Sequence, residues 1–187
     1  MFMNFLGKIL MLEGRGAPTI AVVLTALTLA GCISSPGPIL TDANAILGEG
    51  GEIHFFSATG ESGRKHSVIT FQWNGSRYLV RNRAADISDF TVHPFEGRDL
   101  IVQSTAARAP RPTEYALARR LAEGVYLLMP ISEDDADDST RDRFCTKTQD
   151  ASCRIATPEQ LFVLARATAS KDEETGGIAV IVPGGRR

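Results

Sequence analysis

The sequence carries little net charge and no long block of charge of one sign. Its 20 Lys and Arg residues nearly balance 22 Asp and Glu residues, so the formal net charge is -2, and the two signs are interspersed along the chain. A nucleic-acid-binding domain usually presents a basic surface. The composition therefore predicts no nucleic-acid partner. With 187 residues, 43% of them apolar, the chain is long enough for one domain with a hydrophobic core.

The apolar run near the N-terminus is too short to cross a membrane. Ile20–Ala30, IAVVLTALTLA, is an uncharged stretch far below the roughly 20 residues of a transmembrane helix. Its length fits the apolar region of a secretory signal peptide, and Lys8 and Arg15 outweigh Glu13 in the leader before it. Translation can start at Met1, Met3 or Met11. The predicted signal peptide spans residues 1–31.

A cysteine follows this run directly. Leu29-Ala30-Gly31-Cys32 resembles the lipobox of bacterial lipoproteins, in which an aliphatic residue, a small residue and Gly or Ala precede an obligatory Cys. The resemblance covers about the first 35 residues and implies that a peptidase cuts before Cys32. It also implies that the thiol of Cys32 receives diacylglycerol and that the freed amine is acylated, commonly with palmitate.

The lipobox resemblance implies a location as well. Two or three acyl chains bind a membrane durably, because each buried methylene adds about 0.8 kcal/mol. Ile33 stands where an Asp would mark inner-membrane retention in enterobacterial lipoproteins. We therefore expect membrane lipid to be one partner, and the location to be the cell envelope, at the periplasmic face of the outer membrane. Ser34–Pro38, SSPGP, is rich in residues that block regular structure, so residues 32–50 are predicted to be the lipidated Cys and a flexible tether.

Cysteine is otherwise scarce. Of the three cysteines, Cys32 is assigned to the lipid, which leaves Cys145 and Cys153 in CTKTQDASC. In an oxidising compartment this pair predicts a structural disulfide, and closing so short a loop stabilises the fold by roughly 2–3 kcal/mol. A metal site or a redox pair is the alternative, but no CxxC spacing accompanies the pair.

Residues 51–187 are predicted to form one mainly β domain, an antiparallel meander of 7–8 strands. Short runs rich in Val, Ile, Phe, Tyr and Thr alternate with turns that contain Gly or charge, which is typical of hairpins. The exposed edge of a sheet can pair with other chains, and proteins avoid this by closing or covering the sheet. We therefore expect a small barrel or a two-sheet sandwich. The predicted strands are 52–57, 67–73, 77–82, 89–94, 99–104, 115–121, 125–131 and 177–182.

One helix interrupts the β pattern near the C-terminus. Thr157 can cap it, Pro158 suits its first turn, and Gln160 completes a capping box. The helix is predicted over about 157–169, with one apolar face formed by Leu161, Leu164, Ala165 and Thr168. It should pack on the sheet.

The sequence lacks recognisable catalytic and cofactor motifs, so we expect no cofactor and consider an enzyme the less favoured hypothesis. His54, His66 and His93 fall on separate strands or turns, without an H-x-H or H-E-x-x-H spacing that would predict a metal site. A run of acidic residues lacks the alternation of an EF-hand loop, and we expect a solvated loop there. Its members are Glu133, Asp134, Asp135, Asp137, Asp138 and Asp142.

Arg77, Arg81 and Arg83 lie at strand spacing and could line an anion-binding face, although charged residues also protect exposed strands from pairing with other chains. The sequence as a whole favours an envelope lipoprotein whose small non-catalytic β domain binds an envelope protein or a ligand. Two alternatives stay open. One is an envelope hydrolase whose site is not visible in the sequence, and the other is a structural envelope component.

Overall fold

The computed structural model describes residues 33–59, 63–81, 87–107, 112–147, 153–171 and 176–184. Cys32, Arg83 and the predicted signal peptide lie outside these residues. Among the described residues, none of the helices is long and apolar enough to span a lipid bilayer.

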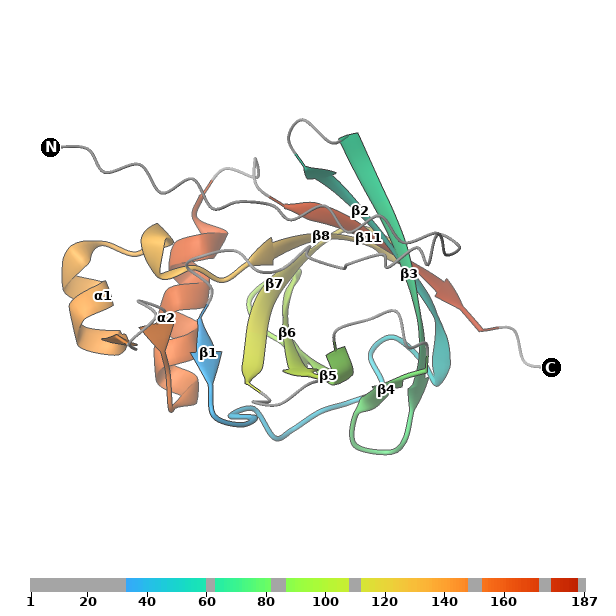
Figure 1. Cartoon of the computed structure of the whole chain (residues 1–187), viewed down its shortest axis with the longest axis horizontal. Coiled ribbons are helices and arrows are strands. Elements are labelled where there is room, and N and C mark those ends of the chain that lie inside the picture. Colours follow the sequence, from blue (N-terminus) through green and yellow to red (C-terminus); the bar gives the residue numbers. More distant parts are fainter. Residues whose placement is uncertain are drawn as a thin grey trace, which may run out of the picture.

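Eight antiparallel strands form a closed barrel (Figure 1). Around the ring each strand pairs with the next in the order β2-β3-β4-β5-β6-β7-β8-β11, and β11 pairs with β2. The predicted mainly β fold is therefore confirmed, and it is a barrel rather than a sandwich. The strands are β2 Gly50–Thr59, β3 Gly63–Trp73, β4 Tyr78–Val80, β5 Ile87–Pro94, β6 Asp99–Ala106, β7 Thr113–Ala122, β8 Val125–Pro130 and β11 Gly177–Pro183.

Tight turns join several consecutive strands. Gly75, Gly97 and Gly124 have positive φ angles of 97°, 58° and 68° in the β3–β4, β5–β6 and β7–β8 turns. Only glycine adopts such angles without steric cost. In the first of these turns the side-chain oxygen of Asn74 also accepts hydrogen bonds from the backbone N–H groups of Ser76 and Arg77. These local contacts explain why the hairpins could be predicted from the sequence.

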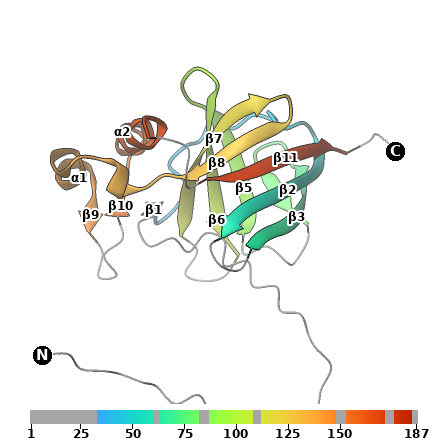
Figure 2. The ribbon, with the colours of Figure 1, turned by 90° about the horizontal axis from the view of Figure 1, so that it is seen from above.

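The remaining elements form a layer on the outside of the barrel, beside β7 (Figure 2). They are β1 Ser34–Ser35, the 3-10 helix η2 Glu133–Asp135, α1 Asp138–Phe144, β9 Thr146–Lys147, β10 Cys153–Arg154 and α2 Pro158–Ala169. Strand β1 pairs with both β7 and β10. A buried core between the barrel and this layer includes Ile101, Leu117 and Met129 from the barrel and Leu161 and Leu164 from α2.

Helix α2 is the predicted C-terminal helix. The Thr157 side chain caps it and forms a capping box with Gln160, and Pro158 begins it. Its buried residues are Leu161, Leu164, Ala165 and Thr168, which are the four that the sequence predicts to share a face. The spacing of these residues makes one side of the helix apolar, and that side packs against the barrel wall.

The prediction of a flexible tether over residues 32–50 is wrong for residues 33–50, which the structure describes. Ile33 and Ser35 are buried, and Ile33 belongs to the core beneath α2. Farther on, the side-chain oxygen of Gln103 accepts hydrogen bonds from the backbone N–H groups of Ile39 and Leu40, at 3.0 Å each. Residues 33–50 therefore run along the barrel, because their backbone groups find partners in its wall.

The acidic run is not a simple solvated loop. It contains η2 and α1, and Asp137 is the N-cap of α1. Hydrogen bonds from Ser139 and from the backbone and side chain of Thr140 lower the pKa of Asp137 to about 2. Asp135 accepts a hydrogen bond of 2.7 Å from the Thr168 hydroxyl. Asp137 therefore stabilises the start of α1, and Asp135 links η2 to α2.

Candidate functional site

Alternation along the strands places one face of every strand inside the barrel. On the side of β2 to β5 this interior is filled. Six large side chains from these strands form one buried cluster together with Ala179 of β11. The six are Ile53, Ile69, Phe71, Tyr78, Phe90 and Val92. The Tyr78 ring stacks on Phe90 with centroids 5.0 Å apart and meets Phe71 edge-on at 5.3 Å.

The Tyr78 hydroxyl group forms a hydrogen bond within the protein. It accepts a 2.7 Å hydrogen bond from the backbone N–H of Leu47, and burial raises the pKa of Tyr78. This bond ties the segment before β2 to the packed half of the interior. Tyr78 is therefore a structural residue, with its polar atom satisfied.

The opposite wall of the interior, formed by β6, β7 and β8, includes small side chains and is partly exposed to solvent. Val102 of β6 lies opposite Ala116 of β7, and Ala118 of β7 lies opposite Leu128 of β8. Val102, Ala116 and Leu128 are only half-buried although they point inward. Val102 and Leu128 also pack against the buried cluster, and this apolar wall keeps partial access to solvent.

The same wall ends in polar residues. Glu114 of β7 lies opposite Ser104 of β6, and alternation with Ala116 places both side chains on the inner face. Burial raises the pKa of Glu114, and burial is the only cause of that shift. Among the described residues, no group forms a hydrogen bond or an ion pair with this carboxyl group. A half-buried carboxyl group without a partner among the described residues, beside partly exposed apolar side chains, is suited to binding a polar group of a ligand.

Sequence reasoning missed Glu114. The predicted strand began at Tyr115, so Glu114 stood outside it, whereas β7 begins at Thr113. The signal was present in the segment TEYALARR, where Tyr115 and Leu117 pack outward and Glu114, Ala116 and Ala118 alternate with them. The feature that could have identified Glu114 is an acidic residue at a strand position whose side chain points into the barrel.

The three histidines do not converge. His93 is buried on the outer side of β5, where its Nδ1 lies 3.1 Å from the Asp42 carbonyl oxygen and its Nε2 lies 2.8 Å from the Thr91 hydroxyl. Burial lowers the pKa of His93. This residue fastens the segment before β2 to the barrel. His54 and His66 instead meet on the outer face of β2 and β3, with nitrogens 3.2 Å apart.

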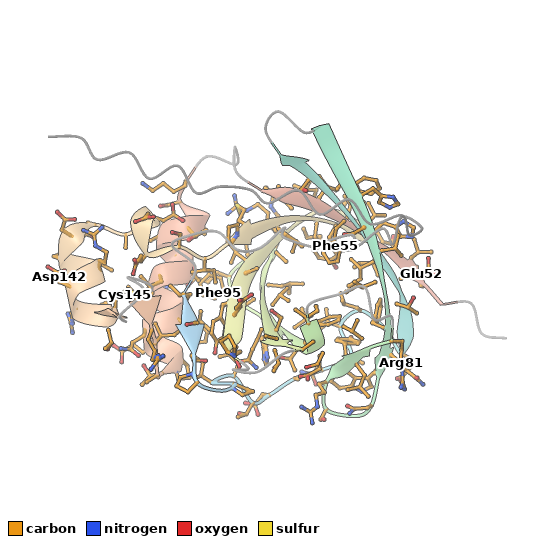
Figure 3. The ribbon with its side chains drawn as sticks, viewed as in Figure 1. Glu52, Phe55, Arg81, Phe95, Asp142 and Cys145 are labelled. Atoms are coloured by element: carbon orange, nitrogen blue, oxygen red, sulfur yellow. A yellow bond between two sulfur atoms is a disulfide. The ribbon has the colours of Figure 1, made fainter. Side chains whose placement is uncertain are left out.

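Two of the three arginines proposed for anion binding have partners in the protein. Arg77 forms an exposed ion pair with Asp89 at 3.5 Å, and Arg81 donates a 2.7 Å hydrogen bond to the Gln72 side chain. Figure 3 shows Arg81 at the edge of the molecule near β4. Arg83 lies outside the described residues. An anion-binding face made of all three stays a prediction, and these two contacts do not favour it.

The predicted disulfide is present in the structure. Cys145 and Cys153 form a disulfide, which Figure 3 places between α1 and α2. The carboxylate of buried Glu133 lies within 4.8 Å of both sulfur atoms. Because the two sulfurs are bonded to each other, they offer no thiolate to a metal, and this group is structural. Comparison of the chain with known protein families, curated proteins and solved structures found no match.

Proposed function

We propose that this protein is an envelope lipoprotein whose barrel binds a small amphipathic molecule. The observation that carries the proposal is the partly exposed inner wall of β6, β7 and β8, which is apolar at Val102, Ala116 and Leu128 and ends in the carboxyl group of Glu114, for which the described residues provide no partner. Eight-stranded barrels are wide enough to hold one small ligand. An apolar body would lie along this wall, and a hydrogen-bond donor of the ligand would face Glu114.

The described interior residues favour binding over hydrolysis. A hydrolase of the serine type needs an imidazole beside its nucleophile. Ser104 lies opposite Glu114, but His93 and the pair His54 and His66 all lie on the outer face of the barrel. Among the described residues, therefore, the inner face does not combine a nucleophile with a histidine base.

The anchor places this binding domain close to a membrane. A lipid on Cys32 would be attached one residue before Ile33, which is buried in the core beneath α2. We propose that Cys32 holds the barrel at the periplasmic face of the outer membrane, with almost no free chain between lipid and domain. A ligand that partitions into lipid would then have a short path to the barrel.

Lipidation is tested by the intact mass of the detergent-extracted protein. We expect the wild type to lack residues 1–31 and to carry an acyl mass increment, because only the Cys32 thiol can form the thioether. The variant Cys32→Ala should stay uncleaved and unacylated. A Ser34→Ala variant, two residues farther on, is the matched control and should be processed like the wild type. An uncleaved, unacylated wild type would remove the anchor from the proposal.

Ligand binding is tested with N-phenyl-1-naphthylamine, a neutral apolar fluorophore that has one N–H donor. We expect saturable binding of one molecule per barrel, with a rise in fluorescence as the probe leaves water. Ala116→Trp places a large side chain on the partly exposed inner wall and should weaken binding by at least about tenfold, which corresponds to 1.4 kcal/mol.

The control for this test is Ala122→Trp, at the exposed end of the same strand. It adds the same side chain outside the barrel and should leave binding unchanged. Thermal unfolding checks that both variants are folded, and Val102→Trp repeats the test from β6 if Ala116→Trp is not. Equal binding by a folded interior variant and the control would contradict an interior site, as would the absence of saturable binding by the wild type.

A further inference from the structure

We infer that His54 and His66, with Glu52 supporting His54, form a binding site for a divalent transition metal on the outer face of the barrel. This inference does not depend on the proposed ligand site, because these residues lie on the other face of β2 and β3. Figure 3 shows Glu52 on the outside of the wall formed by these strands. His54 and Glu52 alternate with Ile53, which is buried inside the barrel.

The register of the β2–β3 hairpin brings the two imidazoles together. His54 lies opposite Val68, and His66 lies opposite Phe56, so the two histidines are diagonal neighbours on one face. Their ring planes differ by 20°, with centroids 5.3 Å apart, while His54 Nδ1 and His66 Nε2 are 3.2 Å apart. This centroid distance is close to the largest that rings with such a nitrogen separation can have. The two nitrogens therefore point toward each other.

The nitrogen separation suits two ligands of one metal. Zn–N bonds of about 2.0–2.1 Å at a tetrahedral angle place the two nitrogens about 3.3 Å apart. A metal that bridges Nδ1 of His54 and Nε2 of His66 would replace the hydrogen bond between them, after each ring rotates by about 35° so that both lone pairs meet at the metal. Both rings are reached by solvent, since His66 is exposed and the His54 side chain is 28% exposed.

Each ring is held by a second contact. His54 Nε2 lies 3.2 Å from the Glu52 carboxylate, which can only accept a hydrogen bond from it. That contact assigns the N–H to Nε2, so the lone pair of Nδ1 can accept the hydrogen bond from His66 Nε2 or, in its place, bind a metal. A carboxylate behind a ligating histidine is the usual arrangement in metal sites. On the other ring, Phe56 stacks on His66 with centroids 4.7 Å apart.

The donor set indicates the kind of metal. Imidazole nitrogens suit Zn²⁺, Ni²⁺ and Cu²⁺, and the order of affinities for such ligands favours Cu²⁺. With two protein nitrogens, the other coordination positions would be taken by water or by an external ligand. We therefore expect one Cu²⁺ to bind more tightly than one Zn²⁺.

The test is a calorimetric titration of the detergent-extracted protein with Cu²⁺ and, separately, with Zn²⁺ at pH 7.5. We expect one site, with Cu²⁺ bound more tightly, and an electron paramagnetic resonance spectrum of bound Cu²⁺ with couplings from two imidazole nitrogens. His54→Gln or His66→Gln should weaken Cu²⁺ binding by more than tenfold and remove one of the two nitrogen couplings.

Glu52→Gln tests the supporting carboxylate. It should weaken Cu²⁺ binding by about 10-fold, as expected for a partner behind a ligand. Glu49→Gln, another exposed acidic residue nearby in the chain, is the matched control and should leave the affinity unchanged. Wild-type affinity and an unchanged spectrum in the double variant His54→Gln/His66→Gln would overturn the site, and so would the absence of any wild-type binding. All of these side chains are on the surface, and thermal unfolding would verify that the variants remain folded.

Discussion

Replacing Arg119 by methionine is expected to lower the free energy of unfolding by about 3–5 kcal/mol, because it leaves a buried carboxylate without its partner. Arg119 Nε donates a hydrogen bond to one oxygen of Asp99 and Nη2 donates to the other, both at 3.0 Å. The side chains are only 15% and 10% exposed, respectively. Removing one partner of a nearly buried ion pair with two hydrogen bonds lowers the free energy of unfolding far more than removing one partner of an exposed ion pair.

Arg119 also connects the barrel to the outer layer. Its Nη2 donates a 2.9 Å hydrogen bond to the backbone carbonyl of Ala169, the last residue of α2. A positive charge at this end of a helix is favourable, and the bond satisfies a carbonyl that has no partner within the helix. Arg119→Met removes this contact too, so the variant should also loosen the C-terminal turn of α2.

Urea denaturation monitored by circular dichroism measures this effect. Arg166→Met is the matched control, because Arg166 forms a 2.7 Å ion pair with Glu96 in which the two side chains are 56% and 54% exposed. That pair should contribute less than about 1 kcal/mol. The double variant Asp99→Asn/Arg119→Met should recover part of the loss, since no charge is then left buried. A loss for Arg119→Met no larger than that of the control would contradict the expected role of burial.

The sequence alone could not predict that Asp99 and Arg119 form an ion pair. Asp99 and Arg119 lie directly opposite each other on β6 and β7, yet 20 residues separate them, and nothing local fixes which residues face each other. The register depends on the turns and on which face is buried. The same reason hid the contact of His54 with His66, which exists only in the register of the β2–β3 hairpin.

Features encoded within a few residues were predicted. The turns between the predicted strands 67–73 and 77–82 and between 115–121 and 125–131 contain Gly75 and Gly124. These turns and the capping box of Thr157 and Gln160 are local, and the structure contains all of them. Strand β1 was missed because Ser34 and Ser35 carry no strand pattern. They pair only because the finished barrel presents the start of β7 to them. Helix α1 was missed because its acidic residues are typical of loops as well as of helix N-termini.

Replacing both Cys145 and Cys153 by serine is expected to lower the free energy of unfolding by roughly 2–3 kcal/mol, the value for a short closed loop. Cys153 is fully buried in the core beneath α2, and Cys145 packs against that core from the end of α1. Two residues after Cys153, Ile155 donates a 2.9 Å backbone hydrogen bond to the Ser34 carbonyl of β1. The bridge therefore holds the layer that contains the first described residues of the chain.

Urea denaturation of the wild type and of Cys145→Ser/Cys153→Ser measures this loss, and Cys32→Ala serves as the control that keeps the bridge. Because the bridged layer lies outside the barrel, the double variant should still bind N-phenyl-1-naphthylamine with wild-type affinity under native conditions. Faster proteolysis should be confined to the segment around α1, β9 and β10. An unchanged unfolding midpoint would show that the bridge contributes no stability, and loss of probe binding would show that the barrel interior depends on this layer for its shape.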